Sequence, residues 1–180
     1  TNSVRKILRD GDRDPVEFEI APGTVDPREA LRVFDERLPA NVSVVTGIGH
    51  AALSFPVQFM TRARPLHLHS TAFGTIGQIL SNAIGVAMAQ SQPVVAFEGD
   101  GSAMQNIQEL DTAARLGIKL LYVVLNDEAY GMEYHKLRAV NLNGHLSVVP
   151  TPDFGAVGRV FGCRGRLART LDEMVAAIDE

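Results

Sequence analysis

Two acidic segments, each placed directly after a strand-like apolar run, constrain this chain more than any other feature. Asp100 follows the run at residues 93–97, and Asp127 follows the run at residues 120–125. The carboxyl ends of parallel strands meet at one edge of an open α/β sheet, where ligands bind, so we expect the two carboxylates to lie close together. Carboxylate oxygens suit a hard cation such as Mg²⁺, which keeps substrate phosphates among its ligands. The sequence therefore predicts a magnesium-bridged diphosphate site.

The Gly-Asp-Gly-Ser sequence at 99–102 has local features that fit a diphosphate. We expect Ser102 to cap a helix that ends at Gly117, because small and apolar residues recur there at helical spacing. A helix N-terminus offers free N–H donors, and Gly99 and Gly101 let the backbone approach a ligand closely. Taken alone, these four residues are more often a turn before a capped helix. The second acidic segment is what favours a ligand site.

Two further glycine-rich segments are expected at the same edge of the sheet. Residues 71–77, Thr-Ala-Phe-Gly-Thr-Ile-Gly, lead into a helix at 78–90 whose small and apolar residues predict burial, with another chain as the expected partner. The strand-like run at 42–46 ends in Gly47-Ile48-Gly49-His50. Without the acidic segments, residues 71–77 would be only a connection to a core helix. His50 could donate a hydrogen bond to a phosphate or could be a surface histidine without a partner, and both readings stay open.

Strand-like and helical segments alternate along the chain, which predicts an α/β fold: a parallel sheet of about five or six strands with helices on both faces. The strand-like runs lie at 42–46, 66–69, 93–97, 120–125 and 161–167, and later helices are expected at 153–160 and 171–178. Asp26 with Pro27 and Glu29 is a strong helix start. We therefore expect a linker or arm at 1–25 and one domain at 26–180.

Composition excludes several other classes of protein. The chain has 180 residues, of which 46% are hydrophobic, enough for one domain with a substantial core. A net charge of −4 offers no footprint for nucleic acid. Cys163 is the single cysteine, so the chain has no disulfide framework, and a reducing, cytoplasmic location is expected. We expect Cys163 to be a small core residue. The sequence shows neither a signal peptide nor an apolar run long enough to span a membrane, and its start at Thr1 suggests a processed or cloned piece.

The Gly-Asp-Gly at 99–101 and the Asn126-Asp127 pair resemble the diphosphate-binding motif of thiamine diphosphate enzymes. Asp100 and Asp127 are 27 positions apart, which agrees with the family pattern. The resemblance implies the thiamine diphosphate-binding fold, with Mg²⁺ held by Asp100, Asp127 and the backbone carbonyl of Ala129. Many relatives have Asn at the position of Asp127, so this site would be more anionic.

The resemblance also implies which residues hold thiamine diphosphate. The Gly74 carbonyl would receive the amino group of the aminopyrimidine, and Ile76 would wedge the cofactor into its bent form. His50 stands where the family often has a Gln that contacts the diphosphate. The full set of expected cofactor contacts is Ile48, Gly49, His50, Gly74, Ile76, Gly99, Asp100, Gly101, Ser102, Asp127, Ala129, Tyr130, Gly131 and Met132.

Within the family, residues 74–77 and 126–132 are most similar to the group of acetolactate synthase-like enzymes, pyruvate decarboxylase and benzaldehyde lyase. That group decarboxylates a 2-oxo acid and transfers the acyl anion, and its activating Glu lies on a separate pyrimidine-binding domain, normally of a neighbouring subunit. The resemblance therefore implies no catalytic residue in this chain and a homo-oligomer (dimer or tetramer). From the charge and the lack of a long apolar run we expect no nucleic-acid or membrane partner. The chain would be a fragment, or a beta-type subunit of a split 2-oxo acid decarboxylase, and inactive alone.

Several residues depart from the family's sequence pattern or receive no functional role. Glu133, His135, Lys136 and Arg138 differ from biosynthetic acetohydroxyacid synthases, and we interpret them as a solvated helix face rather than substrate contacts. No metal-ligand spacing connects His67, His69 and His145.

Three other classes of protein can be compared with this prediction. A non-catalytic interaction subunit of the same fold stays open as an alternative. A dinucleotide-binding oxidoreductase is disfavoured because no Gly-x-Gly-x-x-Gly follows the first strand, and a nucleotide triphosphatase because no Gly-Lys-Ser or Gly-Lys-Thr occurs.

Overall fold

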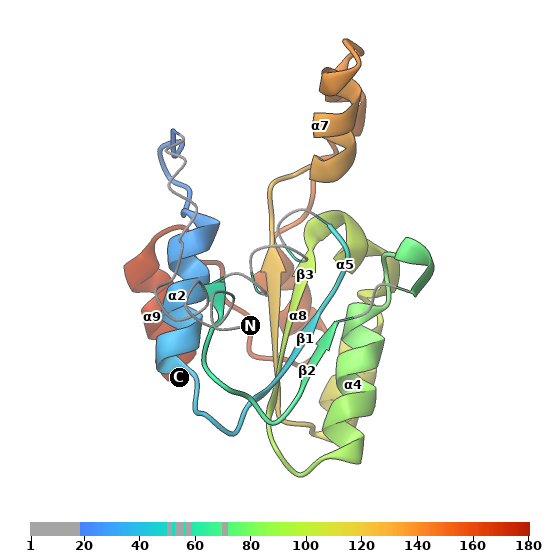
Figure 1. Cartoon of the computed structure of the whole chain (residues 1–180). Coiled ribbons are helices and arrows are strands. Elements are labelled where there is room, and N and C mark those ends of the chain that lie inside the picture. Colours follow the sequence, from blue (N-terminus) through green and yellow to red (C-terminus); the bar gives the residue numbers. More distant parts are fainter. Residues whose placement is uncertain (1–18, 50–51, 53–55, 57–58, 70–71) are drawn as a thin grey trace, which may run out of the picture.

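A parallel four-stranded sheet forms the centre of the described structure (Figure 1). The structure is a computed structural model, and it describes residues 19–49, 52, 56, 59–69 and 72–180. The strands lie in the order β2-β1-β3-β4 and are β1 (Ser43–Thr46), β2 (His67–His69), β3 (Val94–Gly99) and β4 (Leu120–Leu125). The chain passes from β1 to β2 on one side of β1 and then crosses to the other side of β1 to form β3. The strand order therefore reverses between β1 and β3. Ligands bind at such a point in α/β sheets.

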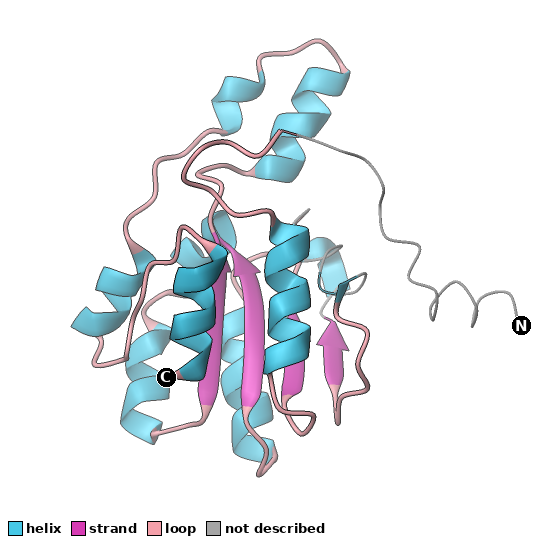
Figure 2. Cartoon of the chain, turned by 90° about the vertical axis from the view of Figure 1, so that its left-hand side faces the viewer, coloured by secondary structure: helices cyan, strands magenta, loops and turns pink. Residues whose placement is uncertain are grey.

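Helices cover both faces of this sheet (Figures 1 and 2). The α-helices are α2 (Pro27–Arg37), α4 (Ile79–Ala89), α5 (Asp100–Asn106), α6 (Glu109–Leu116), α7 (Gly131–Ala139), α8 (Phe154–Val160) and α9 (Leu171–Asp179), with short 3-10 turns η2 (Ala72–Gly74) and η3 (Gly144–Ser147). The predicted helices around 26, 78–90, 153–160 and 171–178 are confirmed. Residues 19–25 contain no helix or strand. In the described part of the chain, no helix combines the length and apolar character needed to cross a bilayer.

The core is split by the sheet into two layers, because successive side chains of a strand point to opposite faces. Val44, Val95 and Phe97 join the layer under α2 and α9, where the Phe34 and Phe97 rings meet edge to face with centroids 5.2 Å apart. Val45, Val94 and Ala96 pack instead against Ile79 and Ala83 of α4. Both faces of β1 and β3 are therefore buried, which explains their nearly continuous apolar sequences.

The predicted strand at 161–167 is wrong. Helix α8 ends in a turn there: Gly162 has φ of +83°, and the Cys163 N–H donates to the Gly158 carbonyl. The chain then passes so close to α8 that a Cβ on Gly165 would lie 2.0 Å from the carbonyl oxygen of Gly155. This segment packs against a helix rather than a strand, so the described residues form four strands instead of five or six.

The single helix predicted between Ser102 and Gly117 is also wrong in its details. The structure has two helices, α5 and α6, separated by a turn at 107–108. Helix α5 begins at Asp100, with Gly99 as its N-cap residue, so Ser102 is not the cap. Gly117 does end α6, in the left-handed conformation with φ of +58°.

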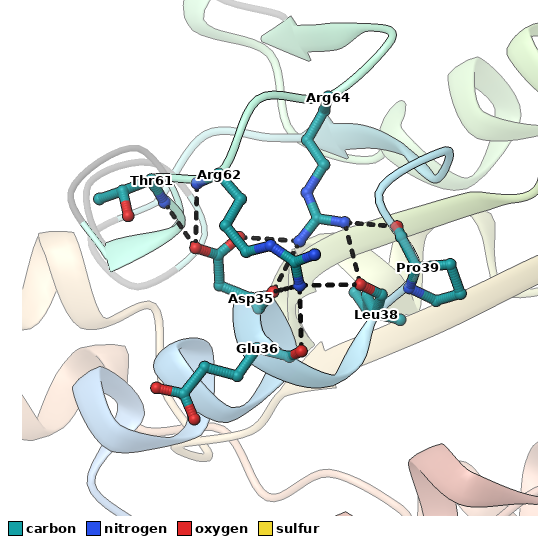
Figure 3. A network of polar contacts seen from close by, with 7 residues as sticks. All are labelled: Asp35, Glu36, Leu38, Pro39, Thr61, Arg62 and Arg64. Atoms are coloured by element: carbon teal, nitrogen blue, oxygen red, sulfur yellow. Dashed lines mark hydrogen bonds and ion pairs between the residues drawn. The ribbon is translucent and has the colours of Figure 1, made fainter.

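A buried ion pair ties the segment before β2 to the end of α2 (Figure 3). Arg64 and Asp35 are 2.8 Å apart and almost fully buried, and the N–H groups of Thr61 and Arg62 donate to the other oxygen of Asp35 at 2.8 and 3.0 Å. The Arg62 guanidinium donates to the carbonyls of Asp35, Glu36 and Leu38. These carbonyls at the end of α2 lack helical partners, so the two arginines satisfy the helix terminus.

Asp35→Ala is expected to lower the free energy of unfolding by about 3–5 kcal/mol, because Arg64 would be left buried without its counter-charge. Urea denaturation followed by circular dichroism measures the change. The matched control is Asp179→Ala, which breaks the exposed Arg37–Asp179 pair and should cost at most about 1 kcal/mol. Equal losses in the two variants would contradict the importance of this network.

Candidate functional site

The carboxylates of Asp100 and Asp127 lie together at the carboxyl edge of the sheet. Gly99 of β3 pairs with Leu125 of β4 in the parallel ladder. Asp100 follows one of these paired residues directly, and Asp127 follows the other after one residue. Neighbouring strands therefore deliver both side chains to the same place, as the sequence predicted.

The two groups interact, and the interaction is unfavourable when both are ionised. Burial raises the pKa of Asp100 to about 6, the nearby Asp127 carboxyl adds to the rise, and the N–H groups of Gly101 and Ala129 oppose it. Desolvation also raises the pKa of Asp127, against hydrogen bonds from the Ala129 N–H and from Asp100. Asp100 is only 2% exposed, and its Oδ2 is buried without a hydrogen-bond partner. An unpartnered buried carboxylate oxygen is costly, so this site suits a cation.

The loop that carries Asp127 is fixed by hydrogen bonds to the Asn126 side chain and by a backbone bridge to Val148. The Asn126 Oδ1 accepts hydrogen bonds from the Glu128 N–H at 3.1 Å and from the Thr151 hydroxyl at 2.9 Å. A short antiparallel bridge joins Ala129 to Val148. Asn126 therefore shapes the loop, and its side-chain oxygen is already occupied by these two donors.

The turn at 72–77 adopts a conformation that is rare for ordinary residues. Phe73 has φ of +58°, and its side chain is fully exposed, while Gly74 and Gly77 have φ of +62° and +79°. Positive φ is an outlier for a bulky side chain, and such positions cluster at functional sites. The Gly77 N–H donates to the Ser102 hydroxyl at 2.7 Å. The turn with Gly74 and the partly buried Ile76 is thereby attached to the segment that follows β3.

Gly99 and Gly101 differ in what surrounds them. A Cβ on Gly101 would lie 2.6 Å from the Tyr130 ring, so this glycine allows Tyr130 to pack closely against it. A Cβ on Gly99 would meet nothing within 4 Å. The space beside Gly99 at the end of β3 is therefore open, which is compatible with close approach of a ligand to this glycine.

The loop after β1 reaches the same edge. Ile48 and Gly49 are partly exposed there, and Gly47 packs so closely on Ile79 that a Cβ would lie 2.5 Å from that side chain. His50 lies outside the described residues, so its two readings remain predictions.

Helix α7 projects beyond the sheet, and it carries Gly131 and Met132 in its first turn (Figure 1). A hollow of about 420 Å³ lies between α7 and η3, lined by Tyr130, Glu133, Lys136, Leu137, Leu146 and Ser147, and does not include the two carboxylates. No α7 residue is buried, and the exposed Glu133 and Lys136 form an ion pair, as expected of a solvated face.

The histidines do not form a metal site in the described structure. His69 shares a hydrogen bond of 2.7 Å with the Thr46 hydroxyl, His67 lies on the same strand, and His145 lies on η3. In the ranges that the structure describes, no three side chains of His, Cys, Asp or Glu gather as a set of metal ligands. Cys163 is partly buried, and burial raises the pKa of its thiol, so it is not an activated nucleophile.

Sequence reasoning assigned no role to Glu98, which is fully buried beside the candidate site. Its carboxyl group hydrogen-bonds to the hydroxyls of Ser102 and Tyr122. The available signal was an ionisable residue inside a buried strand, which needs polar partners to be tolerated there.

A comparison with known families agrees with this geometry. The family described as thiamine pyrophosphate enzyme, C-terminal TPP binding domain, matches residues 47–180. This chain belongs to that family. The resemblance seen in the sequence is thus confirmed, and the parallel sheet with helices on both faces is the fold of a thiamine pyrophosphate-binding domain.

Relatives of this TPP-binding domain include larger enzymes. The chain is 31% identical over 153 residues to the acetolactate synthase isozyme 2 large subunit of Escherichia coli, covering 83% of this chain and 28% of the relative. It is 33% identical over 140 residues to a probable 2-ketoarginine decarboxylase of Pseudomonas aeruginosa, covering 76% of this chain and 25% of the relative. The crystal structure of benzoylformate decarboxylase from Polynucleobacter necessarius superimposes with a TM-score of 0.75 and 26% identity, over 91% of this chain and 32% of that one. The TPP-binding domain thus spans about a quarter to a third of these proteins.

In the absence of divalent metal, the contribution of Asp100 to stability should fall as pH rises from about 4 to about 6. The raised pKa of Asp100 means that the folded domain keeps a proton that the unfolded chain, with an ordinary Asp, has already lost. Asp100→Asn removes this effect, so the variant should exceed the wild type in unfolding free energy by about 2–3 kcal/mol at pH 7, with little difference near pH 4. Urea denaturation in EDTA at several pH values measures the gap.

The control for this prediction is Asp111→Asn, which changes an exposed carboxylate paired with Arg115. It should change stability by less than about 1 kcal/mol at every pH. A gap between Asp100→Asn and wild type that stays constant from pH 4 to pH 7 would contradict the assignment of the raised pKa.

Proposed function

We propose that this chain is the diphosphate- and magnesium-binding module of a thiamine diphosphate-dependent enzyme that decarboxylates a 2-oxo acid and transfers the acyl anion. The observation that carries the proposal is the pair of adjacent carboxylates, one of which has a buried oxygen without a partner. A divalent cation between Asp100 and Asp127 would neutralise their repulsion and give that oxygen a ligand bond.

The donor set fits Mg²⁺. Asp100 and Asp127 supply two carboxylate oxygens, and the Ala129 carbonyl is the proposed third ligand from the protein. Magnesium bound with phosphates typically takes one or two carboxylates and completes its shell with phosphate oxygens and water. The absence of a third acidic or histidine ligand within the described residues is therefore compatible with this ion.

The segments around the carboxylates fit the cofactor. Gly99 has open space above it, and the turn with Gly74 and Ile76 is attached to Ser102. Because the Ser102 hydroxyl is engaged with Gly77 and Glu98, we propose that Ser102 contacts the diphosphate through its backbone only. The remaining proposed contacts are Ile48, Gly49, His50, Gly101, Tyr130, Gly131 and Met132. When bound, the thiazolium ring supplies the electron sink for decarboxylation, and the protein binds and orients it.

The proposed partners follow from the relatives. The names of the three relatives describe one acetolactate synthase and two decarboxylases. We propose a 2-oxo acid substrate and a pyrimidine-binding domain, with its activating Glu, in the same polypeptide or in another subunit.

Asp100→Ala and Asp127→Ala should each abolish Mg²⁺-dependent binding of thiamine diphosphate, with an affinity loss of about 100-fold or more, because each removes one of two carboxylate ligands. Asp127→Asn should largely preserve binding, because the amide still offers an oxygen. Isothermal titration calorimetry with and without Mg²⁺ measures these affinities.

The matched control is again a change at Asp111, here Asp111→Ala, which should bind the cofactor like the wild type. Loss of all binding in Asp127→Asn would argue against the ligand role of position 127. Wild-type binding that is equally tight in EDTA would remove the magnesium bridge from the proposal.

The purified 180-residue chain is expected to show no turnover of 2-oxo acids even with Mg²⁺ and thiamine diphosphate, because the activating Glu is proposed to lie on another domain. A coupled assay for released CO₂, with pyruvate and benzoylformate as probes, measures turnover. Robust decarboxylation by the chain alone would refute the half-site proposal, whereas cofactor binding without turnover even when a pyrimidine-binding domain is supplied would favour a non-catalytic subunit.

A further inference from the structure

Glu98 is an ionisable side chain buried completely in the apolar layer under α4. It is the penultimate residue of β3, and by the alternation of that strand it shares a face with Val94 and Ala96. Those two residues pack against α4. The carboxyl group of Glu98 therefore points toward the same helix, with 0% of the residue exposed.

The partners of Glu98 include the start of α4. Its Oε1 accepts a hydrogen bond from the Ile79 N–H at 3.4 Å, and the Leu80 N–H also donates to the carboxyl group. Ile79 and Leu80 are the first two residues of α4, and the N-cap residue Gln78 makes no side-chain capping bond. Glu98 thus satisfies N–H groups that a capping side chain normally satisfies.

Ser102 extends this connection to the turn that precedes α4. Its hydroxyl donates to the Oε1 of Glu98 and accepts the hydrogen bond of the Gly77 N–H at 2.7 Å. The Oε2 of Glu98 is satisfied separately by the Tyr122 hydroxyl at 2.6 Å. One carboxyl group therefore links three pieces of chain: the start of α4, the turn at 74–77 through Ser102, and the segment 99–102 that follows it in sequence.

We propose that Glu98 is a positioning residue that fixes the turn at 74–77 relative to the segment 99–102, so that the two ends of thiamine diphosphate meet preformed contacts. This inference rests on the proposed function, in which the turn receives the aminopyrimidine and 99–102 receives the diphosphate. A ligand that spans both segments gains from their fixed separation, since preorganisation removes the cost of ordering them on binding. A ligand that contacts only residues 99–102 gains nothing from the fixed separation of the two segments.

Binding of two ligands by the 180-residue chain, each measured by calorimetry at saturating Mg²⁺, tests this role. Thiamine diphosphate spans both segments, whereas inorganic pyrophosphate reaches only the metal and 99–102. Glu98→Ala should weaken thiamine diphosphate binding about tenfold or more, the effect of losing hydrogen bonds to a charged group, and change pyrophosphate binding less than about twofold.

Two further variants separate positioning from simple stability. In Glu98→Gln the amide oxygen can face Ser102 and α4 while its NH₂ donates to the Tyr122 oxygen, so thiamine diphosphate binding should recover to within about threefold of wild type. Tyr122→Phe removes a bond that does not reach the turn, so the ratio of the two affinities should stay unchanged. An equal loss for both ligands in Glu98→Ala, or no loss for either, would overturn the inference.

Should Glu98→Ala fail to fold by circular dichroism, Ser102→Ala provides the same test, because it removes the hydroxyl that joins Gly77 to Glu98 and leaves the bonds of Glu98 to α4 and Tyr122 in place. A selective loss of thiamine diphosphate affinity is expected, and an unchanged ratio would overturn the inference. A wild-type chain that binds neither ligand would instead overturn the proposed function, together with the positioning role of Glu98.

Discussion

The burial of two adjacent carboxylates at neighbouring strand ends is the constraint on which the arrangement of this domain depends. The parallel pairing of β3 with β4 places Asp100 and Asp127 beyond adjacent positions, and the fold cannot move one without breaking the ladder that carries it. Burial, with a smaller contribution from the Asp127 carboxyl, raises the pKa of Asp100 to about 6, so ionising both groups is costly. Stability is thereby sacrificed at a place where a cation would restore it, which is typical of sites built for function.

The rest of the structure serves to hold that edge in place. Two apolar layers bury both faces of β1 and β3, so the strands cannot tilt or slide. The Asn126 side chain closes its loop by accepting hydrogen bonds from the Glu128 N–H and the Thr151 hydroxyl. Ser102 and Glu98 attach the turn before α4 to the segment after β3. Buried strands and hydrogen-bonded loops together support the candidate site from several sides.

The sequence predicted those parts of the fold that depend on local pattern. The continuously apolar runs at 93–97 and 120–125 predicted β3 and β4. Asp26 with Pro27 predicted the start of α2. The meeting of Asp100 and Asp127 followed from parallel topology alone. Residues 161–167 misled the prediction because their apolar side chains pack against α6 and α8, and apolar content does not reveal whether a neighbour is a strand or a helix. The roles of Ser102 and Glu98 could not be predicted, since both depend on Gly77 and Ile79, which are distant from them in the chain.

Helix α7 stands apart from this rigid frame. It has nine residues, and none of them is buried. Its neighbour in the described structure is η3, and the ring of Tyr134 on α7 meets the ring of His145 on η3 edge to face. A helix of this length is marginal in water without packing partners. Since no α7 residue is buried, the side chains of this helix contribute little to the apolar core, and its amide protons are expected to exchange with solvent before those of β3. The domain thus joins a buried sheet to an exposed helical hairpin, and sequence changes on the outer face of that hairpin should leave the core packing intact.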